Sequence, residues 1–181
     1  MDGSSRSWTL AAMATTFPSE SSRLLVAAEA MVVHLDDGAR WLALRAIAYA
    51  RPPNDVLQRL LAASDDLDST SRMVVLEAVA TANPGSKILA RVEAAAIDLE
   101  PDQRTRVLLA AADANLSDRR RLLAAAESAA AAGLSPSGRA KLLVAAAESD
   151  PSAELLALID TAATSLPQEA PDPGADRHRQ R

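Results

Sequence analysis

Apolar and polar positions follow one pattern that recurs along the chain. Each copy starts with a leucine, has an arginine five positions later, and continues with apolar residues spaced to form one face of a helix. The clear copies begin at Leu35–Arg40, Leu67–Arg72, Leu99–Arg104 and Leu134–Arg139. Their arginines are separated by 32, 32 and 35 residues, and a period in this range is typical of stacked helical hairpins.

The residues after each arginine repeat as well. Leucine occupies the fourth position in every clear copy, and alanine occupies the sixth and the eighth. The segment then closes with Pro52, Pro84 or Pro151, whereas the third copy has Leu116 at that place. A degenerate earlier copy follows Arg6. Five segments in one register indicate a genuine repeat, because an alanine-rich composition alone would not align them.

The pattern predicts two helices in each unit: an A helix that ends at the proline turn, and a B helix that leads to the next copy. We expect the A helices near residues 4–16, 37–50, 69–82, 101–114 and 137–149. We expect the B helices near residues 20–34, 54–65, 86–98, 117–132 and 152–165. Asp68 fits the cap before an A helix, Ser117 fits the cap before a B helix, and Pro84 cannot continue a helix. Since no segment alternates as a β-strand does, the sequence predicts an all-α fold.

These units define the predicted domain organisation. One repeat domain would cover residues 1–166, with units at about 1–34, 35–66, 67–98, 99–133 and 134–166. Residues 167–181 are rich in proline, glycine and charge, and such a segment cannot bury enough apolar surface to offset its ordering entropy. We therefore expect a disordered tail there.

Composition narrows the classes of function. The chain has no cysteine, which excludes disulfides and thiolate metal sites, and its formal net charge of −5 argues against nucleic acid or anionic lipid as a partner. The first residues make a poor signal peptide, and no window reaches the ~18 apolar residues of a membrane span. We therefore expect a cytoplasmic protein without a membrane partner. The high use of alanine and arginine is typical of a GC-rich bacterial genome.

The hairpin period and the degenerate first copy resemble the α-solenoid proteins, of the HEAT-like and tetratricopeptide-like kind. Trp41 and Leu44 fit the tetratricopeptide pattern, but Arg45 stands where that pattern has glycine, so the resemblance is architectural. It implies a short right-handed α-solenoid of about five helical hairpins, with a period of ~33 residues. It also implies a concave face that binds a protein or a peptide, and the HEAT-like analogy would line this face with B helices.

Eight side chains are candidates for binding a partner. They are Trp41, Tyr49, Arg59, Arg91, Glu93, Arg119, Arg120 and Arg121. The two aromatic residues share an A helix, and aromatic side chains dominate binding hot spots. Three others are polar B-helix residues, and Arg119–Arg121 forms a dense basic cluster. The recurrent arginines could form a stripe for a carboxylate-rich partner, but the acids in the same loops favour a structural ladder of ion pairs.

Candidate chemistry is sparse. The two histidines, His34 and His178, are isolated, so neither a metal site nor a catalytic triad can be assembled, and we expect no enzyme and no cofactor. The expected function is a non-catalytic scaffold or adaptor that binds a protein or peptide by its concave face. The alternative is a HEAT-like nucleic-acid-binding protein that uses the Arg119–Arg121 edge. Apolar residues at the predicted ends, Trp8 and Leu155–Ile159, also make self-association through the terminal repeats an open alternative.

Overall fold

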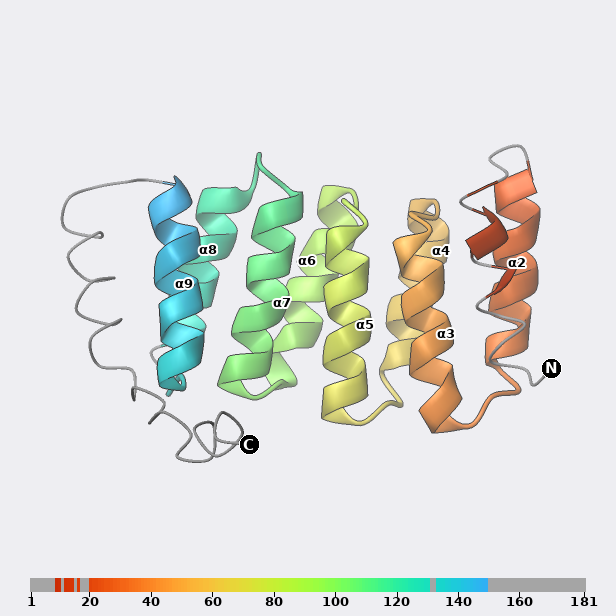
Figure 1. Cartoon of the computed structure of the whole chain (residues 1–181), viewed down its shortest axis with the longest axis horizontal. Coiled ribbons are helices and arrows are strands. Elements are labelled where there is room, and N and C mark those ends of the chain that lie inside the picture. The colour runs from red at the N-terminus through yellow and green to blue at the C-terminus, as the bar shows by residue number, and fades with distance from the viewer. Residues whose placement is uncertain (1–8, 11, 15, 17–19, 131–132, 150–181) are drawn as a thin grey trace, which may run out of the picture.

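The chain folds into a row of helices. The computed structural model describes residues 9–10, 12–14, 16, 20–130 and 133–149. Within these residues every regular element is helical, which confirms the predicted all-α fold. The row runs from α2 at one end to α9 at the other (Figure 1). Trp8, Leu155–Ile159, the predicted helix near 152–165 and the predicted tail 167–181 lie outside the described residues.

The helices alternate between the two predicted kinds. The A helices are α3 (Asp37–Tyr49), α5 (Ser69–Thr81), α7 (Pro101–Ala114) and α9 (Pro136–Ser149). The B helices are α2 (Ser21–Val32), α4 (Asn54–Ser64), α6 (Ser86–Ala95), which the 3₁₀ helix η2 (Ala96–Asp98) extends, and α8 (Arg119–Ala130). These bounds agree with the predicted ranges to within a few residues. Among the helices described, none is both long enough and apolar enough to cross a bilayer.

The start of α5 shows how the repeated leucine and arginine begin an A helix. Leu67 is buried in the loop, and the following residue, Asp68, accepts hydrogen bonds from the backbone N–H groups of Thr70 and Ser71 at 3.0 and 3.1 Å. These bonds satisfy N–H groups that have no partner inside the helix. The hydroxyl and the backbone N–H of Ser71 hold the pKa of Asp68 below its usual value. The N–H of Arg72 then donates to the Asp68 carbonyl at 2.8 Å, which closes the first turn.

The repeated proline marks a sharp turn from A helix to B helix. Arg51 and Asn83 have left-handed φ angles of 51° and 57°, and each is followed by the buried proline of the repeat. The left-handed residue ends the helix, and the proline prevents its continuation. Where Leu116 replaces the proline, Asn115 ends α7 differently, because its side-chain Nδ2 donates to the carbonyl of Ala111 at 2.8 Å.

The repeated leucine and alanine positions form the core. Leu44, Leu76 and Leu108, which occupy the fourth position after the arginine, are at most 2% exposed. The alanines at the eighth position are fully buried in the first three clear copies, at Ala48, Ala80 and Ala112. Because a methyl group occupies little space between helices, these alanines allow the A helices to pack at the short end of the usual interaxial range.

The helices form two layers, and successive helices pack more extensively in one layer than in the other. α4, α6 and α8 lie behind the layer of α3, α5, α7 and α9 (Figure 1). In the front layer α5 packs extensively against both α3 and α7, whereas α4 and α6 touch each other much less. The contact between α7 and α9 is also small. The A layer is therefore tight from α3 to α7 and opens between α7 and α9.

Candidate binding surface

Two of the recurrent arginines, Arg40 and Arg72, contact the loop that follows the preceding B helix. Nη2 of Arg40 donates to the carbonyl of Leu35 at 3.3 Å, and Nη2 of Arg72 lies 3.2 Å from Oδ1 of Asp65. Both side chains are half-buried. The structural role predicted for the arginine ladder is thus confirmed for Arg72, which pairs with an acid of its own loop.

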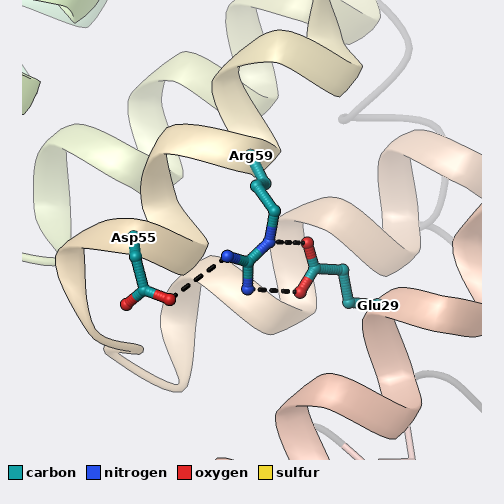
Figure 2. A network of polar contacts seen from close by, with 3 residues as sticks. All are labelled: Glu29, Asp55 and Arg59. Carbon is teal, nitrogen blue, oxygen red and sulfur yellow. Dashed lines mark hydrogen bonds and ion pairs between the residues drawn. The ribbon is translucent and has the colours of Figure 1, made fainter.

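Charged residues of the B helices link neighbouring units. Nη2 of Arg59 in α4 lies 2.9 Å from Oε2 of Glu29 in α2, and its Nη1 lies 3.1 Å from Asp55 (Figure 2). Nη1 of Arg121 in α8 likewise donates to Oε2 of Glu93 in α6 at 2.6 Å. The hydrogen bonds to Glu29 raise the pKa of Arg59, and those to Glu93 raise the pKa of Arg121. Three candidate binding residues, Arg59, Glu93 and Arg121, therefore contact the adjacent unit.

The basic cluster at the start of α8 is divided among different partners. Nη2 of Arg119 is 3.4 Å from the carbonyl of Ala145 in α9 and 3.9 Å from Oδ1 of Asp113 in α7. Arg121 points instead to α6, and Arg120 is exposed. Arg91, the last polar B-helix candidate, is exposed on α6. The three adjacent arginines do not form a common basic patch, because two of them are used in contacts within the protein.

The two aromatic candidates differ in their surroundings. Trp41 is half-buried and packs against the core, whereas Tyr49 is 48% exposed at the end of α3. The guanidinium of Arg45 lies 5.3 Å from the centre of the Tyr49 ring, which is within the range of a cation–π contact. Leu42, two turns before Tyr49, is also exposed. The α3 end of the A layer thus presents an apolar and aromatic stripe.

The same positions of later A helices carry different chemistry. Counted from the repeated arginine, Leu42 corresponds to Val74 in α5, Arg106 in α7 and Lys141 in α9. Tyr49 corresponds to Thr81 in α5 and Asp113 in α7. The outer face of the A helices, which we call the A face, therefore changes from apolar at α3 to charged at α7 and α9. Nε of Arg106 pairs with Oε2 of Glu77 at 2.9 Å and links α5 to α7.

A hollow of about 440 Å³ opens on the A face between α5, α7 and α9. Its lining combines apolar, polar and charged side chains, from Met73 and Glu77 of α5, from Asp102 to Asp113 of α7, and from Ser135 to Lys141 at the start of α9. A second hollow of about 450 Å³ lies between α7 and α9. The two share Leu109, Asp113 and Lys141, so they adjoin each other. Hollows of this size are comparable to pockets that bind small ligands or peptide side chains.

The base of the hollow is fixed at the start of α9. Oδ1 of Asp102 accepts hydrogen bonds from both the backbone N–H and the hydroxyl of Ser135, each at 3.1 Å. Gly138 permits this contact, because a Cβ there would lie only 2.6 Å from the same carboxylate oxygen. The unit before α9 is longer by three residues than the two units that precede it, and Gly133 at its end has a φ of 121°. This longer unit coincides with the wider gap between α7 and α9.

Thr105 is the one buried polar residue in the lining. The residue is 2% exposed, and its hydroxyl oxygen has no hydrogen-bond partner in the described part of the chain. A buried hydroxyl without a partner has a desolvation cost of about 1–3 kcal/mol. Such a group is exceptional in a folded protein, and its presence in a hollow indicates that a bound group could supply the missing hydrogen bond.

Sequence reasoning named none of the residues that line the hollow. The one signal was the interval of 35 residues between the last two arginines, against 32 between the clear copies before them. In the residues that the structure describes, no group of three or more histidine, cysteine or acidic side chains could hold a metal ion. The protein is therefore an all-α protein whose surface carries a groove, formed by the two adjoining hollows. No protein family, curated protein or solved structure matches the chain.

Proposed function

We propose that this chain is a non-catalytic scaffold that binds a protein or peptide along its A face. Its architecture would be a short right-handed α-solenoid of about five hairpins, with a period of about 33 residues. The observation that carries the proposal is the pair of adjoining hollows between A helices, since a groove with mixed apolar and charged lining suits a peptide chain.

Helix packing favours the A layer as the concave side. In a curved stack of hairpins, the inner layer has the shorter spacing between successive helices. Here α3, α5 and α7 pack closely, while α4 and α6 touch little. The proposed binding face therefore differs from the HEAT-like analogy, which would use B helices. The ion pairs of Arg59 and Arg121 support the A layer as the binding face, because these B-helix charges are already paired with residues of neighbouring units.

The nucleic-acid alternative has less support. Binding to phosphates needs several uncompensated cations on one surface. Arg121 is paired with Glu93, and Arg119 lies beside Asp113 and the carbonyl of Ala145. This leaves Arg120 as the exposed cation of the cluster without an acidic partner in the described residues, in a chain of formal net charge −5.

Site-specific photo-crosslinking in the source cells tests the proposal. A benzophenone amino acid would replace Tyr49 or Val144 on the A face, and Gln58 or Ala124 on exposed B-helix positions. We expect discrete crosslinked species from the A-face positions and none from the B-helix positions. Crosslinks from the B-helix positions alone, or equal crosslinking from all four, would overturn the assignment of the binding face. Circular dichroism of each variant verifies that its helices remain intact.

A further inference from the structure

The groove between α7 and α9 has an ordered sequence of charges. Arg106 and Lys141 occupy equivalent positions near its base, Leu109 and Val144 follow one turn later, and Asp113 lies at the far end. Seven residues separate Arg106 from Asp113, and at the rise of an α-helix this corresponds to roughly 10 Å. The groove is therefore basic at one end, apolar in the middle and acidic at the other.

Two of these charges are available to a ligand. Lys141 has no acidic partner within 4.0 Å in the described part of the chain. Asp113 is 63% exposed in its side chain, and its contact with Arg119 is long, at 3.9 Å. Arg106, by contrast, is held by Glu77 at 2.9 Å. A ligand would therefore meet Lys141 at the basic end and Asp113 at the acidic end.

The polar groups at the base favour an extended ligand over a helical one. The Thr105 hydroxyl is buried without a partner. Gln103 also lines the hollow, and its Oε1 accepts a hydrogen bond from the hydroxyl of Ser69 at 2.8 Å, which leaves its amide N–H groups as donors for a ligand. An extended backbone offers free N–H and C=O groups to such partners, whereas a helix satisfies its own backbone groups internally.

From this geometry we infer that the α7–α9 groove binds an extended peptide segment in which two apolar residues separate an acidic residue from a basic one. An extended chain advances about 3.3 Å per residue, so charges three positions apart match the roughly 10 Å between the basic and acidic ends. The acidic residue pairs with Lys141, the basic residue pairs with Asp113, and the apolar residues contact Leu109 and Val144. This inference rests on the proposed function, which it deepens by naming the class of peptide.

Titration of the full chain with a defined probe tests the inference. The probe is the blocked peptide acetyl-Glu-Leu-Leu-Lys-amide, and its control is acetyl-Glu-Lys-Leu-Leu-amide, which has the same composition with adjacent charges. Binding is followed by ¹H–¹⁵N NMR shifts of the protein. We expect shifts concentrated on α7 and α9, and tighter binding of the probe than of the control. Equal binding of the two peptides, or no shifts on α7 and α9, would overturn the inference.

Variants of the protein sharpen the test. Lys141→Glu should weaken binding of the probe by roughly threefold to fivefold, as loss of an exposed ion pair does, and should favour acetyl-Lys-Leu-Leu-Lys-amide instead. Lys87→Glu, the same change at an exposed site on α6, should leave binding unchanged. Thr105→Val should lower the affinity of the protein for the probe without unfolding the protein. A Lys141→Glu variant that binds both peptides as the unmodified protein does would refute the charge pairing.

The two proposals fail separately. If crosslinks map to the A face but the probe and its control bind equally, the peptide class is wrong and the binding face stands. If crosslinks map to the B helices, the proposed function is wrong, whichever peptide binds.

Discussion

The hydroxyl of Thr105 offers the sharpest test of the packing of the A layer. The residue is 2% exposed in α7, and its oxygen has no hydrogen-bond partner among the described residues. Thr105→Val replaces this hydroxyl with a methyl group of similar size at a position where both side chains are β-branched. Their helix propensities are close, so the backbone contributes little to the difference.

Two contributions should raise the free energy of unfolding of Thr105→Val above that of the unmodified protein. Removing an unsatisfied buried hydroxyl relieves a desolvation cost of about 1–3 kcal/mol, and a buried methyl group adds about 0.8 kcal/mol of apolar burial. Since the site adjoins a hollow that water can enter, we expect the lower end of the combined effect, a stabilisation of about 2 kcal/mol. With a urea m-value of about 1–3 kcal/mol per molar, the unfolding midpoint should rise by roughly 0.7–2 M.

Urea unfolding followed by far-ultraviolet circular dichroism measures this shift. The matched control is Thr81→Val in α5, because the Thr81 hydroxyl is satisfied by the carbonyl of Glu77. We expect the control to gain nothing or to lose stability. A Thr105→Val variant that is no more stable than the unmodified protein, at an unchanged m-value, would show that its hydroxyl already has a partner and would refute the argument.

Three further predictions concern the ends of helices. Gly138→Ala should displace the Asp102 carboxylate from Ser135, because its Cβ would lie 2.6 Å from Oδ1 of Asp102. The lost hydrogen bonds should cancel the helix-propensity gain of about 1 kcal/mol from alanine, so urea unfolding should show no increase in stability, and an increase of about 1 kcal/mol would contradict the fixed contact. Arg51→Asn should stabilise it by roughly 0.5–1 kcal/mol, because asparagine tolerates the left-handed φ of 51° better, and a loss of stability would show that the Arg51 side chain is needed. Hydrogen bonds from Ser71 lower the pKa of Asp68, so its carboxylate stabilises the fold above the unfolded pKa near 3.8, and this contribution disappears as the pH falls through the folded pKa. Urea unfolding between about pH 5 and pH 2 should therefore show a steeper acid loss for the unmodified protein than for Asp68→Asn, and parallel curves would contradict the cap.

The sequence predicted the repeated elements because their causes are local. A buried leucine, a cap and an apolar run at helical spacing specify each A helix, as Leu67, Asp68 and Leu76 illustrate. The turns at Arg51 and Asn83 were equally predictable, since a proline follows each. These features depend on a few adjacent residues, and they recur in register.

The surface groove could not be predicted in the same way. Its width depends on the distance between α7 and α9, which no local pattern encodes, although the longer interval before Arg139 marked the place. The roles of Arg59 and Glu93 could not be predicted either, because each pairs with a residue about 30 positions away on a neighbouring B helix, Arg59 on the preceding one and Glu93 on the following one. The pattern of charges along a single helix does not reveal which neighbouring helix each charged side chain will contact.

The division of charge between the two layers links the fold to the proposed function. The pair of Glu29 and Arg59 joins α2 to α4, and the pair of Glu93 and Arg121 joins α6 to α8. A bidentate or short ion pair across a helix boundary fixes the offset between units, because a displacement of either helix would leave a charged group without its partner. On the A face the helices pack through alanine, and Lys141 is left without an acidic partner in the described residues. The ion pairs of the B helices thus fix the offset between units, as the Arg106–Glu77 pair also does between α5 and α7, whereas Lys141 and the exposed Asp113 of the A face remain available to a peptide.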